Sequence, residues 1–98
     1  MPRRASRADA TQPEIVSALR AVGAEVTHLH TVGQGVPDLL VWFRRQWFVI
    51  EAKRPGGRLT ADELDYGLRH PGGVGVVFDV EGALNWIGAV EYRMEGER

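Results

Sequence analysis

Apolar and polar positions follow two different periods along the chain, and these periods separate the expected helices from the expected strands. In residues 11–22 the apolar positions recur at helical spacing, and Gly23 marks the end of the segment. The apolar face consists of Ile15, Val16, Leu19 and Val22. Thr11 stands where an N-cap is expected, with Glu14 three residues on as its capping-box partner. This pattern predicts a short amphipathic first helix.

Strand-like runs fill the middle of the chain. Residues 38–43 and 47–53 are rich in β-branched and aromatic side chains, and three polar residues, 44–46, separate them, which is typical of an antiparallel hairpin. Residues 25–30 alternate enough to form a strand before the hairpin, and residues 74–78 form another after it. We therefore expect four strands, two of them in a central hairpin.

Two further helices are expected after the hairpin. Thr60 is the expected cap of a helix that runs to about Arg69, and residues 80–87 carry apolar side chains at helical spacing. Residues 90–94 alternate between apolar and polar, so they could add an edge strand or pair with a second subunit. The expected fold class is α/β, with a mixed sheet whose central antiparallel hairpin is flanked by short helices.

Length and composition fit one folded domain. With 98 residues, 44% of them hydrophobic and 26% charged, the chain should form a single domain over residues 11–98 after a flexible basic arm, residues 1–10. It has no cysteine, so any metal must be bound through oxygen or imidazole. No run is long and apolar enough for a signal peptide or a membrane span, so we expect a cytoplasmic protein without a membrane partner.

The formal net charge of −1 is not typical of a nucleic-acid-binding protein, but the charge is unevenly distributed. Between residues 44 and 58, Glu51 alone opposes five basic side chains. These are Arg44, Arg45, Lys53, Arg54 and Arg58. The four arginines could contact DNA phosphates, or they could form an ordinary solvated face, and the pattern leaves both interpretations open.

The candidate chemistry lies on the hairpin. Side chains alternate along a strand, so Glu51 and Lys53 must point the same way, roughly 7 Å apart. Asp38 joins them on one face if the connection has two or four residues, which pairs positions of odd sum, but not if it has three. We expect the odd-sum pairing. Alternatively, Asp38 caps a turn and the Glu-x-Lys sequence is a surface ion pair.

A cation would explain why two carboxylates are gathered. At about 5 Å they repel by about 3 kcal/mol at an effective dielectric of about 20. Carboxylates are what Mg²⁺ accepts, so Asp38 and Glu51 are candidate metal ligands, together with the backbone carbonyl of Ala52. Lys53 beside them could position a water and stabilise charge that develops on a phosphoryl group.

Three segments in this order resemble a known family. They are Gly35-Val-Pro-Asp38-Leu-Leu-Val41, Phe48-Val-Ile-Glu51-Ala-Lys53 and Arg58-Leu-Thr60. Together they resemble the VRR-NUC branch of the PD-(D/E)xK nucleases, particularly its minimal stand-alone members from phages and bacteria. The first and last expected helices are also similar to that branch, so the resemblance covers roughly residues 8–88.

The resemblance implies a restriction-endonuclease-like core and a DNA phosphodiesterase that depends on Mg²⁺ or Mn²⁺. It also implies a homodimer that cleaves four-way (Holliday) junctions. Carried over by position, Asp38 and Glu51 are metal ligands, Lys53 is the catalytic lysine, and Glu14 is a helical acid that reaches the same metal. The capping box is the competing explanation for Glu14.

One residue departs from the family pattern. A glutamine commonly follows the Leu-Thr pair on the second helix, whereas this chain has Glu63 there, preceded by Asp62. The added negative charge would disfavour a DNA phosphate unless Glu63 binds metal or points away. Two rival hypotheses therefore remain, a catalytically inactive DNA-binding or adaptor module of the same fold, and an unrelated α/β protein in which Asp38 and Glu51 are turn and surface residues.

Overall fold

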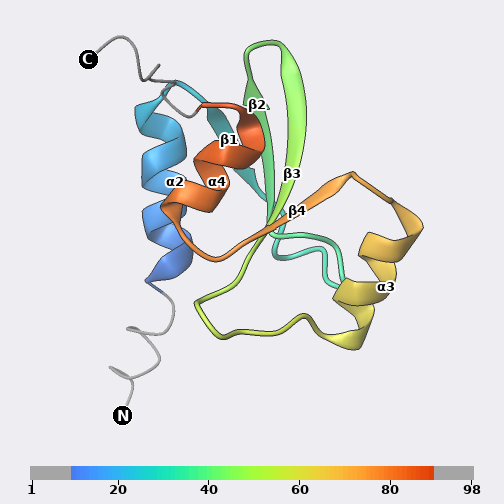
Figure 1. The fold of residues 1–98 in the computed structure, drawn as a ribbon. Helices are drawn as coiled ribbons and strands as arrows, with labels where there is room; N and C mark the ends of the chain where they lie inside the picture. Colours follow the sequence, from blue (N-terminus) through green and yellow to red (C-terminus); the bar gives the residue numbers. More distant parts are fainter. Residues whose placement is uncertain (1–9, 90–98) are drawn as a thin grey trace, which may run out of the picture.

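Four strands form one mixed sheet in the computed structural model, which describes residues 10–89. The strands are β1 (Glu25–His28), β2 (Leu39–Phe43), β3 (Gln46–Ala52) and β4 (Val74–Val77). They lie in the order β1-β2-β3-β4, with antiparallel pairing from β1 to β3 and parallel pairing between β3 and β4. The expected α/β class, mixed sheet and central antiparallel hairpin are thus confirmed (Figure 1).

The described part of the chain contains three helices, as expected. They are α2 (Thr11–Ala21), α3 (Ala61–Arg69) and α4 (Val80–Ile87). Helices α2 and α4 lie together against one face of the sheet, whereas α3 lies apart from them, in the connection between β3 and β4 (Figure 1). Such a crossover is needed because parallel neighbours cannot be joined by a tight turn.

The hydrophobic core lies between the sheet and the helices α2 and α4. Its five largest fully buried side chains are Ile15, Leu19, Leu39, Val41 and Ile50. Alternate residues of β2 point into this core, so its burial pattern switches between buried and intermediate along the strand. Burying each such side chain contributes about 1.5–3 kcal/mol, so the core fixes which face each strand turns away from the helices.

Helix α3 is held differently. It buries none of its residues, and Leu64 and Leu68 remain 51% and 70% exposed. Its first turn is fixed by a capping box, in which the Glu63 amide donates to the Thr60 hydroxyl and the Thr60 amide donates to the Glu63 carboxylate. Capping therefore holds the start of α3, where packing contributes little.

Two local expectations were wrong. The first helix has Ala10 as N-cap without a side-chain cap hydrogen bond, so the expected capping box of Thr11 and Glu14 does not form. Ala10 is already in helical conformation, and Pro13, which needs no amide partner, occupies the first turn. Strand β1 ends at His28 rather than at residue 30. The hairpin turn has two residues, which is one of the lengths that give the expected odd-sum pairing.

The two residues of the hairpin turn, Arg44 and Arg45, both have positive φ, 51° and 69°. This combination defines the type I′ turn, which matches the twist of the strands but prefers Asn and Gly. For an L-residue the left-handed backbone costs about 1–2 kcal/mol. Nothing in the sequence of this turn indicates that conformation.

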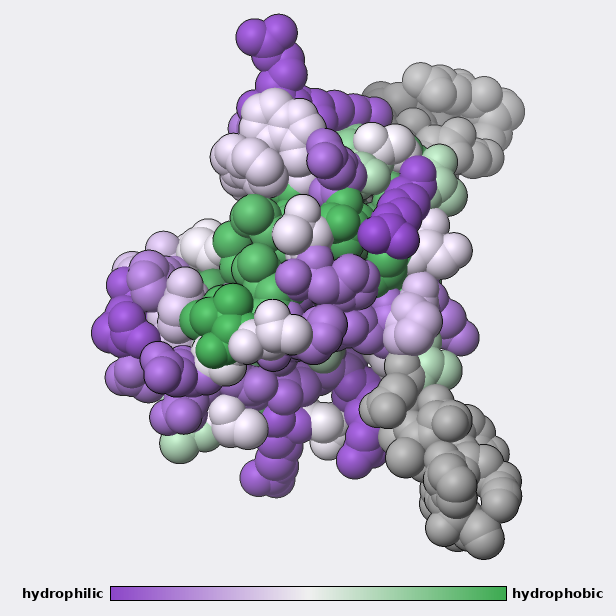
Figure 2. Space-filling model, turned by 180° about the vertical axis from the view of Figure 1, so that it is seen from behind, coloured by the Kyte–Doolittle hydropathy of each residue, from purple (hydrophilic) through white to green (hydrophobic). Residues whose placement is uncertain are grey.

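Some expectations fall on parts of the chain that the structure does not describe. The basic arm, apart from Ala10, and the alternating segment at residues 90–94 lie outside residues 10–89. Among the described helices, none is long and apolar enough to span a bilayer. Seen from behind (Figure 2), apolar side chains reach the surface in the middle of the molecule, framed by hydrophilic ones.

Candidate active site

The hairpin register brings the first two candidate residues together. Leu39 pairs with Ile50 across β2 and β3, and the next position outward places Asp38 opposite Glu51. The sum of the paired positions is odd, as the shared face requires. Because Leu39 and Ile50 point into the core, Asp38 and Glu51 point away from it. The expectation that Asp38, Glu51 and Lys53 share one face is confirmed.

Asp38 is fixed by backbone hydrogen bonds from both sides. The Ala52 amide donates to Asp38 Oδ2 at 3.1 Å, and the Leu29 amide donates to the Asp38 carbonyl at 2.7 Å. Pro37 before it is buried and needs no amide partner at the strand entry. In a strand, amide and carbonyl of one residue point to the same side, so the Ala52 carbonyl is directed toward Asp38.

Glu51 is a buried acid among other acids. The residue is 3% exposed, the one charged or polar residue in the buried part of residues 10–89. The pKa of Glu51 is raised to about 8. Burial is the main cause, and the charge of Asp38, a hydrogen bond with Asp38 and the charge of Glu63 raise it further, while the charge of Lys53 lowers it.

Lys53 lies between two acids. Its Nζ is 3.6 Å from Glu51 Oε2 and 2.8 Å from Glu63 Oε1. Burial by itself would lower the pKa of Lys53, but the hydrogen bond and charge of Glu63, with the charges of Glu51 and Asp38, outweigh it and raise the pKa above its usual value. The lysine is therefore positively charged at neutral pH and held in place.

Glu63 enters this cluster from α3. The same Oε1 that meets Lys53 also accepts the Thr60 amide at 2.8 Å, so the capping box aims the carboxylate at the lysine. Burial would raise the pKa of Glu63, but hydrogen bonds from Lys53 and Thr60 and the charge of Lys53 lower it. Glu63 thus stays ionised, and it does not point away from the site. The sequence marked it only as a departure from the family pattern.

Gly35 allows α3 to approach the loop that leads into Asp38. Its φ is +81°, and a side-chain carbon at this position would collide with the backbone carbonyl of Asp62. Only glycine satisfies both conditions without strain. The contact holds the first turn of α3, and with it Glu63, beside the strand entry that carries Asp38.

The donor set fits a hard divalent cation. Asp38 and Glu51 supply carboxylate oxygens on facing positions, and the raised pKa of Glu51 shows negative charge that a cation would offset. Within residues 10–89 no three His, Asp or Glu side chains form a complete metal-binding group. Mg²⁺ and Mn²⁺ sites commonly combine one or two carboxylates with water, so two carboxylates and the Ala52 carbonyl suffice.

The other predicted residues lie in different places. Glu14 is exposed on the first turn of α2, and no contact in the described structure joins its side chain to Asp38, Glu51 or Lys53. Arg54 and Arg58 line a pocket of about 270 Å³ together with Lys53. Arg44 and Arg45 lie at the far end of the hairpin, about 20 Å from Asp38 at a rise of about 3.3 Å per residue.

The pocket beside Lys53 also contains residues that the sequence did not mark. Thr11 and Gln12, at the amino end of α2, line it opposite Arg54 and Arg58. The basic side chains and the amino end of α2 favour an anion there. Thr11 and Gln12 reach this pocket through the packing of α2 against the end of β3, which the sequence does not indicate.

A second, apolar pocket of about 100 Å³ adjoins the acidic cluster. Glu51 and Glu63 form part of its wall, and the rest is mostly apolar. The apolar lining includes Pro37, Leu59, Leu64, Leu68, Val74 and Val76. The candidate site is therefore basic on one side, acidic in the middle and apolar on the other side.

Comparison with protein-family models, with curated proteins and with solved structures gives no match for this chain.

Proposed function

We propose that this protein is a metal-dependent endodeoxyribonuclease with a restriction-endonuclease-like core and its active site at Asp38, Glu51 and Lys53. One observation carries the proposal. The hairpin register sets Asp38 opposite a buried Glu51, with the Lys53 ammonium 3.6 Å from that carboxylate. A buried acid held beside other acids in this way is costly for folding, and a perturbed pKa of this kind favours a functional site.

In this proposal Asp38, Glu51 and the Ala52 carbonyl would hold Mg²⁺ or Mn²⁺. When bound, the cation would polarise a phosphate oxygen and acidify a water. Lys53 orients the attacking water and stabilises the negative charge that develops on the phosphoryl oxygens. Its ammonium donates up to three hydrogen bonds, so it can keep Glu51 as a partner while it contacts a phosphate.

The proposed substrate is DNA, recognised chiefly through its phosphates. Arg54 and Arg58 line the pocket beside Lys53 and would hold the backbone next to the cleaved bond. The family resemblance favours a four-way junction as the substrate, cleaved by a homodimer in the cytoplasm. Two cuts related by a twofold axis need two active sites, and each chain carries one.

A second candidate function has one observation in its favour. The 2.8 Å ion pair with Glu63 already occupies Lys53, and it adds a negative charge where a phosphate would bind. This arrangement favours a catalytically inactive DNA-binding or adaptor module of the same fold. Such a module binds DNA without cutting it, whether or not a divalent metal is added.

The test is cleavage of end-labelled four-way junction, duplex and single-stranded DNA in Mg²⁺, Mn²⁺ or chelator. We expect metal-dependent cleavage that Lys53→Ala abolishes. Arg69→Ala is the matched control, because Arg69 is a basic residue in an exposed ion pair with Asp65, outside the cluster. Junction binding without cleavage in any metal would support the adaptor, and neither binding nor cleavage would refute both.

A further inference from the structure

The turn of the β2–β3 hairpin combines strain, positive charge and an exposed aromatic side chain. Arg44 and Arg45 hold left-handed backbone, with φ of 51° and 69°. Beside them Trp47 is 62% exposed, although large apolar side chains are normally buried. None of these features is needed for a tight hairpin, since Asn-Gly and a polar strand residue would form it with less strain.

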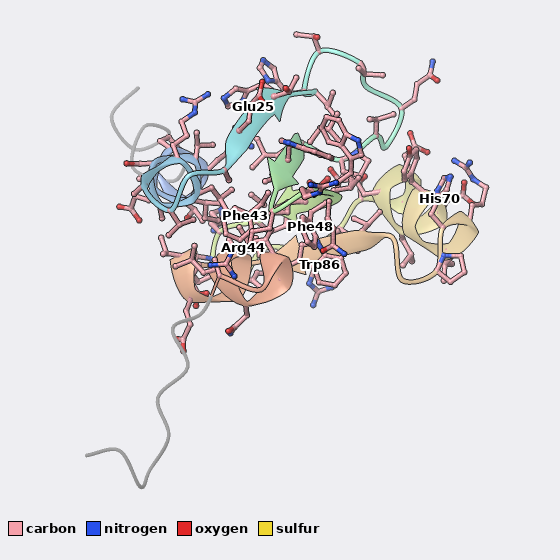
Figure 3. All side chains as sticks on the ribbon, turned by 90° about the horizontal axis from the view of Figure 1, so that it is seen from above. Glu25, Phe43, Arg44, Phe48, His70 and Trp86 are labelled. Carbon is pink, nitrogen blue, oxygen red and sulfur yellow. The ribbon has the colours of Figure 1, made fainter. Side chains whose placement is uncertain are left out.

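The two arginines of the turn are not equivalent. Arg44 packs over the Phe43 ring at 4.7 Å, and its Nη1 lies 3.5 Å from the Gly88 carbonyl at the end of α4. Figure 3 shows Arg44 beside Phe43, close to that helix. Arg45 is exposed and has no side-chain hydrogen bond or ion pair within residues 10–89. Its backbone strain is therefore not offset by any contact in the described structure.

Trp47 is supported from one side and open on the other. Trp42, its cross-strand partner, lies with its ring centre 4.7 Å away at an interplanar angle of 53°. This contact holds the Trp47 ring in place while most of its surface remains exposed. An aromatic ring fixed in this way, next to a free guanidinium, is the combination with which proteins stack unpaired nucleobases and bind the adjoining phosphate.

Trp47 also lies on the same sheet face as the candidate active site. Side chains alternate along a strand, so those at positions 47, 49, 51 and 53 point to one face of the sheet, and Ile50 points to the other face, into the core. Six residues separate Trp47 from Lys53, which is about 20 Å along the strand. Duplex DNA spans that distance in about six base pairs at about 3.4 Å each, so one DNA molecule can reach both places.

We propose that Arg45 and Trp47 form a second DNA contact, in which Trp47 stacks on an unpaired nucleobase and Arg45 binds the neighbouring phosphate. This contact rests on the proposed function in so far as the ligand is the same DNA. It lets the protein favour DNA that has unpaired bases a fixed distance from the cut.

The test is binding of unlabelled twelve-residue oligodeoxythymidylate and of a fully paired duplex, followed by tryptophan fluorescence and by competition. Chelator is present throughout, so cleavage cannot affect the result. We expect the oligonucleotide to quench the tryptophan fluorescence and Trp47→Ala to weaken oligonucleotide binding at least about fivefold, the lower end of what stacking of one base is worth. Duplex binding should change less, because its bases are already stacked.

Arg45→Gly gives an independent readout. Glycine accepts the positive φ, so the variant should melt about 4 °C higher than the wild type while it binds the oligonucleotide more weakly. Arg45→Lys, which keeps the charge and the strain, should retain most of the binding without a gain in melting temperature. The control is Arg69→Ala, because Arg69 lies in helix α3, where a glycine would lower stability by itself.

Three outcomes would overturn the inference. Oligonucleotide binding unchanged in both Trp47→Ala and Arg45→Gly would remove the contact. A loss of self-association in Trp47→Ala, without a change in DNA binding, would make Trp47 part of a protein interface. Equal losses for duplex and oligonucleotide would show a phosphate contact without base stacking. Cleavage abolished by Lys53→Ala is a separate result, so the two proposals can fail independently.

Discussion

The two ends of the β2–β3 hairpin both depart from the most stable arrangement, one through its electrostatics and the other through its backbone conformation. At the open end Asp38 and Glu51 face each other, and Glu51 is 3% exposed, so an ionisable acid is buried beside another acid. At the turn end Arg44 and Arg45 are exposed, but their backbone is left-handed. Between the two ends, Leu39, Val41 and Ile50 are fully buried in an ordinary apolar core.

The two ends of the hairpin carry different kinds of energetic penalty, so they should respond to different ligands and substitutions. Burial of like charges is an electrostatic penalty that a bound cation removes, whereas a strained turn is a conformational penalty that a ligand of the arginines does not relieve. The first end should therefore respond to metal and pH. The second should respond to backbone substitutions that leave metal binding unchanged.

The largest expected effect comes from Glu51→Gln. Loss of one of two carboxylate ligands should lower metal-dependent cleavage by about a thousandfold or more, which corresponds to about 4 kcal/mol. The metal-free protein should become more stable at pH 8, because a neutral amide replaces a buried acid near Asp38 and Glu63. Initial cleavage rates and chemical denaturation measure the two effects. A variant that is slower and also less stable would mean that Glu51 is mainly structural.

Gly35→Ala should have the next largest effect. The left-handed backbone and the collision with the Asp62 carbonyl together should cost about 3 kcal/mol of unfolding free energy and move α3 away from Asp38. Gly33→Ala is the matched control, because Gly33 has φ +77° and open space around it. That control should lose only about 1–2 kcal/mol. Equal losses in urea denaturation would contradict the close approach of α3.

Stability of the metal-free protein should depend on pH through Glu51. The pKa of this acid rises from 4.5 to about 8 on folding, so between these values the folded protein holds a proton that the unfolded chain has lost. The stabilising contribution is complete below about pH 4.5 and is lost as pH rises through about 8. The slope should be about 1.4 kcal/mol per pH unit. Denaturation from pH 5 to 8 should show it, and Glu51→Gln should flatten it.

The smallest expected effect is that of Glu63→Gln. Glutamine can keep the capping box with Thr60, so stability should change by less than about 0.5 kcal/mol. Release of Lys53 from its ion pair should raise cleavage by up to about fivefold, the equivalent of about 1 kcal/mol. Glu63→Ala, which also removes the cap, should instead lower the melting temperature. A fall in the cleavage rate of Glu63→Gln would make Glu63 a part of the active site.

The helices and strands were predicted from the sequence more accurately than the turns and caps that connect them. Helix α3 and its Thr60 cap were predictable because an N-cap residue before a helix acts locally. The odd-sum register of the hairpin was predicted, but the sequence left open whether Glu51 or Lys53 stands opposite Asp38. The Arg44-Arg45 turn could not be predicted, because neither residue favours left-handed backbone.

The contact between Glu63 and Lys53 was also beyond local reasoning. It depends on the close approach of Gly35, in the loop before β2, to Asp62, in the first turn of α3, and on the capping box that aims the carboxylate. The capping box predicted at Thr11 is the reverse case, a local pattern that the structure does not use. A correct capping pattern was present, but Ala10 already adopts helical conformation, so the threonine lies inside the helix.

Mn²⁺ binding at pH 8, measured by titration calorimetry, tests most directly whether Asp38 and Glu51 form one cation site. We predict that the wild type binds Mn²⁺ and that Asp38→Asn weakens this binding by about a hundredfold. Asp65→Asn should leave Mn²⁺ binding unchanged, because Asp65 is an exposed acid that pairs with Arg69 on α3. Equal Mn²⁺ affinity in wild type and Asp38→Asn, or no binding by the wild type at millimolar Mn²⁺, would contradict the shared cation site.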